Sequence, residues 1–109
     1  MTDSKHYIYV LIDPNTGLPR YVGRTSKSAN ARAREHIRLA HHDNGPSRLH
    51  RWIRDISPKS PAIMIAQVIV GDSKDAARAE IKWQKRLERF DLLQWVDRTS
   101  HNYRTLVNT

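Results

Sequence analysis

Five polar residues, spread along the chain, have side chains that could together break a phosphodiester bond. They are expected on the inward sides of predicted strands and helices: Tyr9, Tyr21, Arg32, His36 and Glu80. This reaction needs a group that activates water, a cation that offsets the charge developing on phosphorus, and a carboxylate that can hold Mg²⁺. The five residue types together meet these three needs.

Two short apolar segments must place the tyrosines on one face of a sheet. Residues 6–12 alternate as a strand that is apolar on both faces, which predicts a central position in the sheet. The stretch DPNTG predicts a turn, in which Gly17 permits a left-handed conformation. The following RYVGRT returns as an antiparallel strand, and a hairpin symmetric about Asn15 would set Tyr9 opposite Tyr21.

The arginine and the histidine fall on a predicted helix that begins near Ser26 or Ser28 and runs to about His41. Arg32 and His36 are four residues apart, so they share one side of this helix. They lie on or beside its apolar stripe, which consists of Ala29, Ala33, Ile37 and Ala40.

A second helix is predicted from about Ser47 to Ile56, and a strand from residue 62 to residue 70. The inward residues of this helix are Leu49, Trp52, Ile53 and Ile56. Its mostly outward residues are three arginines, Arg48, Arg51 and Arg54, which are candidate substrate contacts.

Glu80 lies on a long helix predicted from Lys74 or Asp75 to about Phe90. The apolar arc of this helix contains Ala76, Ala79, Trp83, Leu87 and Phe90, and Glu80 lies at its edge. A lone carboxylate there costs several kcal/mol unless a cation or a donor meets it. Two interpretations fit equally at this point: Glu80 pairs with a buried arginine or extends to solvent, or it is a metal ligand.

The overall charge indicates a polyanionic partner. Lysine and arginine number 19 against 11 acidic residues in a chain of 109, which gives a net charge of +8. The alternative is a surface whose charge serves solubility only. The chain has no cysteine, which excludes disulfides and thiolate chemistry and agrees with a reducing compartment. We therefore expect one cytoplasmic domain over residues 1–109, without a membrane span.

The same residues resemble, in order and spacing, the motifs of the GIY-YIG nucleases. Tyr7-Ile8-Tyr9 looks like the first motif of the family, and Tyr21-Val22-Gly23 looks like the second. Arg32 with His36 matches the arginine and histidine of the family's first helix, and Glu80 in AARAEIKWQKRL matches its later glutamate. Two departures fit a strand: Tyr7 replaces a glycine, and Val22 replaces an isoleucine.

This resemblance implies a fold of the α/β (α+β) class, a small three-stranded antiparallel sheet flanked by about three helices. It also implies a DNA endonuclease that uses one Mg²⁺ or Mn²⁺ ion and leaves 5′-phosphate and 3′-hydroxyl ends, with RNA as the open alternative substrate. A non-catalytic or partner-activated binding module on the same fold is the alternative function. A partner protein or a dimer is one way in which such a small domain would gain specificity.

The resemblance also implies a role for each residue. Tyr9 would activate the attacking water, with Tyr21 placing water, phosphate or Tyr9, and His36 sharing the proton of Tyr9. Arg32 would contact the scissile phosphate and Glu80 would ligate the metal. Because a tyrosine pKa is about 10 in water, the nearby cations Arg24 and Arg32 are expected to lower the pKa of Tyr9. The late asparagine of the family has its best match in Asp97, with Gln94 and Asn102 as rivals.

Overall fold

The computed structural model describes residues 4–42 and 47–89. In chain order its elements are β1 (Ser4–Ile12), β2 (Pro19–Thr25), α1 (Ala29–His42), α2 (Arg48–Asp55), β3 (Ala62–Gly71) and α3 (Ser73–Arg89). The predicted fold class, a three-stranded antiparallel sheet with three helices, is confirmed. The predictions that concern Phe90, Gln94, Asp97 and Asn102 lie outside the described residues.

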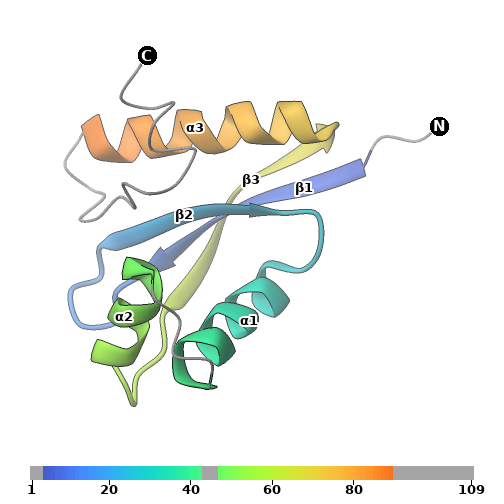
Figure 1. Cartoon of the computed structure of the whole chain (residues 1–109). Coiled ribbons are helices and arrows are strands. Elements are labelled where there is room, and N and C mark those ends of the chain that lie inside the picture. Colours follow the sequence, from blue (N-terminus) through green and yellow to red (C-terminus); the bar gives the residue numbers. More distant parts are fainter. Residues whose placement is uncertain (1–3, 43–46, 90–109) are drawn as a thin grey trace.

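The sheet has the order β2-β1-β3, so β1 is central as its apolar pattern predicts. Helix α3 covers one face, while α1 and α2 cover part of the other (Figure 1). Ile8 and Val10 of β1 are buried on the α3 face, and Tyr9 and Leu11 are buried on the α1–α2 face. The strand that carries Tyr9 is therefore fixed from both sides.

The hairpin between β1 and β2 turns as predicted but pairs in a different register. Gly17 has φ of +74°, a left-handed conformation that glycine adopts without steric cost. However, Tyr9 pairs with Gly23, and Leu11 pairs with Tyr21, so the predicted pairing of the two tyrosines is wrong by two residues. The hairpin centres on Thr16 instead of Asn15, and the register shifts again after Leu11. A shift of two residues preserves the face, so the tyrosines still share one side of the sheet.

Two serines begin the helices that cover this side. The Ser28 hydroxyl accepts a hydrogen bond from the Ala31 amide at 3.2 Å, and the Ser47 hydroxyl accepts one from the His50 amide at 3.1 Å. Both satisfy amides that lack a partner within the helix. The predicted inward side of α2 is confirmed, since its four apolar residues are buried: Leu49, Trp52, Ile53 and Ile56.

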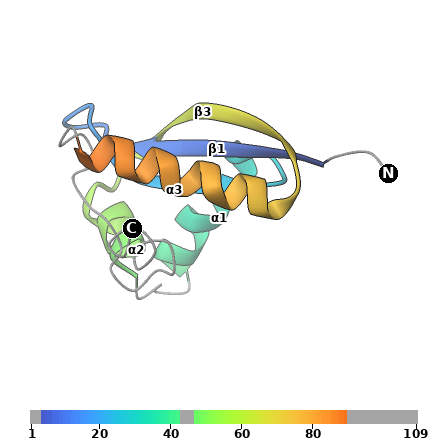
Figure 2. The ribbon, with the colours of Figure 1, turned by 90° about the horizontal axis from the view of Figure 1, so that it is seen from above.

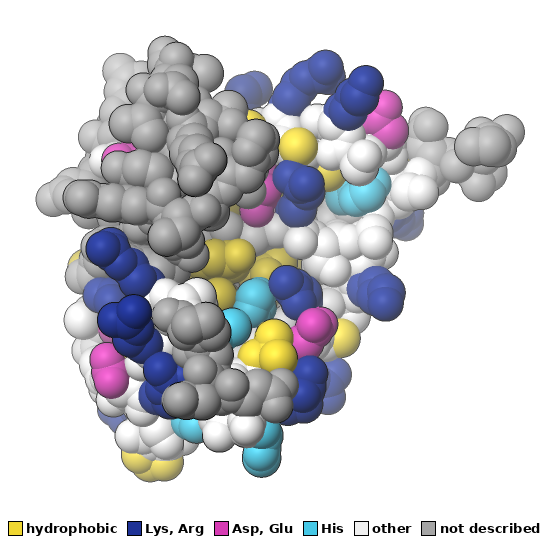
Figure 3. All heavy atoms as spheres, viewed as in Figure 1, with side chains coloured by type: hydrophobic (Ala, Val, Ile, Leu, Met, Phe, Trp, Pro, Cys, Tyr) yellow, Lys and Arg dark blue, Asp and Glu magenta, His cyan; other side chains and the backbone are white. Residues whose placement is uncertain are grey.

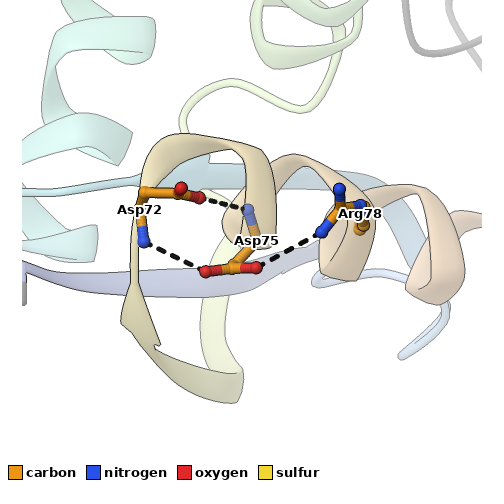
Figure 4. A network of polar contacts seen from close by, with 3 residues as sticks. All are labelled: Asp72, Asp75 and Arg78. Atoms are coloured by element: carbon orange, nitrogen blue, oxygen red, sulfur yellow. Dashed lines mark hydrogen bonds and ion pairs between the residues drawn. The ribbon is translucent and has the colours of Figure 1, made fainter.

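Helix α3 begins with a reciprocal pair of aspartates (Figure 4). The Asp72 carboxylate accepts from the Asp75 amide at 2.9 Å, and the Asp75 carboxylate accepts from the Asp72 amide at 3.2 Å. Asp75 also forms an ion pair with Arg78 at 3.4 Å. Gly71 lies against the Asp75 carboxylate and has no room for a side chain. The helix therefore starts at Ser73, slightly before the predicted residues.

The buried side of helix α3 is turned from the predicted apolar arc towards Glu80 and Gln84, which are both buried. Ala76 and Leu87 are buried, while Trp83 is only partly covered and donates through Nε1 to Gln67 on β3 at 2.9 Å.

Among the described residues, no helix has the length and apolar character needed to span a membrane.

Candidate active site

The Tyr9 side chain lies across the backbone of the neighbouring strand β2. A Cβ atom on Gly23 would lie 2.5 Å from both Cζ and OH of Tyr9, and 2.9 Å from Cε2 of Tyr21. Real Cβ atoms do not approach other atoms this closely, so only glycine permits this position of the ring. The YVG motif therefore has a local physical reason: its glycine makes room for the tyrosine of the first motif.

Helix α1 brings an imidazole to the Tyr9 hydroxyl. The OH of Tyr9 lies 3.4 Å from Nε2 of His36, and both residues are buried. The Tyr21 ring completes the cluster, with its centroid 6.3 Å from that of Tyr9 and 5.7 Å from that of His36. The structure thus places together three residues that the sequence singles out on three different elements.

Arg32 lies one helical turn before His36, and it is half-buried. Its NH1 forms an ion pair with Oε2 of Glu35 at 3.0 Å. It is also close enough to lower the pKa of Tyr9 and that of His36. Glu35 was not singled out by sequence reasoning, although its spacing three residues after an arginine on a helix is a recognisable signal.

Glu80 is 4% exposed and lies on α3, the helix that covers the opposite face of the sheet from Tyr9 and His36. Its Oε1 accepts from NH1 of Arg24 on β2 at 3.0 Å. Of the two sequence interpretations, pairing with an arginine is therefore realised in this structure. The charge of Glu80 is also felt at Tyr9, where it raises the pKa of the phenol.

Burial decides the protonation of the tyrosine and the histidine. Burial and the neighbouring Tyr21 raise the pKa of Tyr9 above its ordinary value, and the opposing effect of Arg32 is smaller. Arg32 lowers the pKa of Tyr9 as expected, but burial outweighs it and the net shift is upward. Arg24, the other cation expected to act on Tyr9, pairs with Glu80. Burial lowers the pKa of His36 to about 4, with contributions from Arg32 and His50. At neutral pH His36 is uncharged and can accept a proton.

His50, on α2, is a neighbour of this cluster that sequence reasoning missed. Its ring centroid lies 5.7 Å from that of His36. Within the described part of the chain, Nδ1 of His36 and both ring nitrogens of His50 are buried without a hydrogen-bond partner. Burial, Arg54 and Arg32 lower the pKa of His50, so both imidazoles favour the neutral form. The signal in the sequence is weak: His50 lies about 100° around the helix from Leu49, beside the inward stripe.

The three arginines of α2 do not act as one group. Arg48 and Arg51 are on the exposed side of the helix, as predicted. Arg54 is half-buried and donates through NH1 to the Ala40 carbonyl at 3.0 Å, which ties α2 to α1. Lysine and arginine side chains surround a central area in which histidine and hydrophobic side chains are visible (Figure 3).

Glu80 is the buried carboxylate that the sequence assigns to a metal ion. Over residues 4–42 and 47–89, no three histidine, aspartate or glutamate side chains gather as a ligand group. Mg²⁺ is commonly held by one or two carboxylates together with water and substrate phosphates. The buried Glu80 carboxylate, which already faces a cationic group, fits that mode of binding.

A family profile that describes the GIY-YIG catalytic domain matches residues 5–92, which is most of the chain. The chain therefore belongs to the GIY-YIG catalytic domain family, and its fold is of the nuclease type. The family acts on nucleic acids and generally uses divalent metals. No curated protein and no solved structure matches the chain.

Proposed function

We propose that the protein is a metal-dependent endonuclease that hydrolyses phosphodiester bonds of DNA. The observation that carries this proposal is the contact between the Tyr9 hydroxyl and Nε2 of a neutral, buried His36, 3.4 Å apart. A neutral imidazole at that position is a proton acceptor, and Tyr9 connects it to the side of the site where water would attack.

The raised pKa of Tyr9 and the lowered pKa of His36 restrict how a proton can be removed from water. Because the pKa of Tyr9 is raised, a free phenolate is rare at neutral pH. Tyr9 can still act as a base if it gives its own proton to His36 while it takes one from water. The net result is hydroxide at the phosphorus and a protonated His36. Burial makes that protonated form short-lived, so the proton returns to solvent after each turnover.

Arg32 is the proposed contact to the scissile phosphate. A guanidinium has five N–H donors, so it can retain its bond to Glu35 while it donates to a phosphate oxygen. Tyr21, which packs beside both Tyr9 and His36, holds their rings in place. Arg48 and Arg51 lie on a neighbouring exposed surface and would contact the nucleic-acid backbone.

Glu80 is the residue that would hold the divalent ion, Mg²⁺ or Mn²⁺. When bound, the ion supplies positive charge for the leaving 3′ oxygen, consistent with products that carry 5′-phosphate and 3′-hydroxyl ends. Arg24 and the ion would compete for the Glu80 carboxylate. A bound ion would therefore release Arg24 to contact the substrate.

The test is cleavage of supercoiled plasmid with Mg²⁺, with Mn²⁺ or with EDTA, by the wild type and by Glu80→Gln. We expect nicked or linear product only with metal and only from the wild type. Arg78→Gln, on an exposed part of the same helix, is the control and should cleave normally. Metal-independent cleavage, or full activity of Glu80→Gln, would contradict the proposal.

The alternative is a binding module on the same fold that does not cut by itself or needs a partner protein. The raised pKa of Tyr9 favours this alternative, because the phenolate that would act as the base is scarce at neutral pH. Retardation of DNA on a gel without any cleavage in either metal would support it.

A further inference from the structure

Strand β3 has an unusual surface for a chain this basic. The large hydrophobic side chains that are exposed within the described residues all belong to this strand, Met64, Ile65, Val68 and Val70, with 46–62% of their surface exposed. No residue of β3 is ionisable. Exposed edge strands usually carry a proline or a charged residue such as lysine, because an unprotected edge pairs with other chains. Exposed apolar patches of this kind mark contact surfaces.

The outer edge of β3 has no partner among the described elements. In the sheet order β2-β1-β3, the strand pairs only with β1. Figure 2 shows it along the outer side of β1, away from α3, with no described helix or strand beyond it. Its ten residues span about 33 Å, at about 3.3 Å per residue. An edge with unpaired N–H and C=O groups selects an extended strand as its partner. The pairing of β3 with β1 has one irregularity, a register shift beside Ala66.

We propose that the partner is β3 of a second copy of this chain, paired antiparallel. An edge strand that pairs antiparallel with itself is self-complementary, so the assembly closes as a two-fold dimer. Two molecules of charge +8 repel one another, and β3 is a surface where they can meet without opposing like charges.

A groove beside β3 agrees with this arrangement. It has a volume of about 590 Å³ and lies between the start of α1 and the sheet, where Tyr7, Ile63 and Ile65 form its apolar side. Side chains of an added strand that point towards the α1 face would cover this side. The tyrosines of the candidate active site lie on β1 and β2, so pairing at the outer edge of β3 does not use the strands that carry them. The pairing depends on the surface of β3 and not on the nuclease function.

The first test is the molar mass of the full chain in solution, by analytical ultracentrifugation over a wide concentration range. We expect a monomer–dimer equilibrium for the wild type and a monomer for Val68→Lys, because the added charge has no partner at the edge. Ala31→Lys adds the same charge on an exposed position of α1 and should dimerise normally. A wild type that stays monomeric throughout, or a Val68→Lys variant that dimerises normally, would overturn the proposal.

The second test uses the absence of cysteine from the chain. Val68→Cys places a single thiol near the centre of β3, where the antiparallel copies face each other. In oxidised glutathione it should form a disulfide-linked dimer. With Val68 of the two copies opposite each other, Ala62→Cys lies at the end of the strand, where the two thiols would be about 40 Å apart. It should stay unlinked, as should Lys82→Cys on α3. Equal cross-linking at positions 62 and 68, or none at position 68, would contradict antiparallel pairing even if Val68→Lys fails to fold.

Discussion

The ring of Tyr9 occupies the space above Gly23 that any other residue would fill with its own side chain. These two residues pair across β1 and β2, and Tyr9 OH reaches His36 from there. The glycine of one motif thus sets the position of the tyrosine hydroxyl of the other.

Gly23→Ala should therefore reduce cleavage much more than it reduces folding. The new methyl group would push the Tyr9 ring away from His36, and a shift of about 1 Å at a reacting group costs roughly 100-fold in rate. Overpacking should lower the free energy of unfolding by about 1–3 kcal/mol. Single-turnover cleavage and urea unfolding measure the two effects.

Gly17→Ala is the matched control for this substitution. No atom lies within 4 Å of an added Cβ there, but the φ of +74° makes alanine cost about 1–2 kcal/mol. It should lose stability and keep its cleavage rate. If Gly23→Ala cleaves as well as Gly17→Ala, the proposed position of Tyr9 is wrong.

The ion pair between Arg24 and Glu80 predicts a stability that responds to metal. Arg24→Ala removes a partner from a carboxylate that is 5% exposed, and we expect a loss of about 1 kcal/mol because Arg24 itself is partly solvated. Mg²⁺ can supply the missing charge. The midpoint of thermal unfolding of Arg24→Ala should therefore rise with Mg²⁺ more than that of the wild type.

Arg78→Ala removes an exposed arginine of the same helix and serves as the control for that experiment. Its response to Mg²⁺ should equal that of the wild type. An identical response of all three proteins would argue against Glu80 as the metal ligand.

Because His36 is buried in its neutral form, we expect the folded protein to lose stability in mild acid. Its pKa is about 4 in the folded chain, below the ordinary value near 6.5, so the unfolded chain binds a proton that the folded chain does not. Its contribution is fully present above about pH 6.5 and is lost as the pH falls towards 4. Between pH 7 and pH 5 we expect a decrease of about 2 kcal/mol in the free energy of unfolding.

Urea unfolding at the two pH values, on the wild type and on His36→Gln, measures this contribution. The variant should show a smaller decrease. The part that remains reflects other groups, including His50, whose pKa is also lowered. Equal pH dependence of the two proteins would show that His36 is not buried in its neutral form.

His50 is predicted to be a positioning residue for His36. For Nε2 of His36 to accept from Tyr9, the proton of the neutral ring must be on Nδ1. The ring centroid of His50 lies 5.7 Å from that of His36, a separation that a hydrogen bond through one water can span. His50→Phe should lower kcat about tenfold without a change in KM.

Nitrogen chemical shifts of His36 give a measurement that is independent of activity. They should show the Nδ1–H form in the wild type and a mixture of forms in His50→Phe. His42→Phe, at the exposed end of α1, should match the wild type. Unchanged chemical shifts of His36 in His50→Phe would show that His50 does not position His36.

The features of this fold that depend on local sequence could be predicted. Serine caps and the 3.6-residue period were enough to place α1 and α2 and the buried side of each, from Ser28 to Ile53. The hairpin register could not be predicted, because it depends on an irregularity after Leu11 that residue spacing does not reveal.

The residues of the site were found by type and spacing, while their pairings needed the structure. Nothing near Glu80 in the sequence indicates that its partner is Arg24, which lies 56 residues earlier on another element. The direction of the Tyr9 pKa shift also depended on three-dimensional burial. The sequence shows the cation Arg32, which lowers the pKa of Tyr9, but it does not show the burial that raises this pKa by more.

The most direct test of the central claim is single-turnover cleavage of an end-labelled duplex in Mg²⁺ by Tyr9→Phe and Tyr7→Phe. Each substitution removes one tyrosine hydroxyl from β1, but of these two hydroxyls it is that of Tyr9 that contacts His36. The account predicts that Tyr9→Phe loses cleavage by at least about 100-fold, while Tyr7→Phe remains close to the wild type and leaves 5′-phosphate ends. Equal activity of the two variants would contradict a catalytic role for Tyr9.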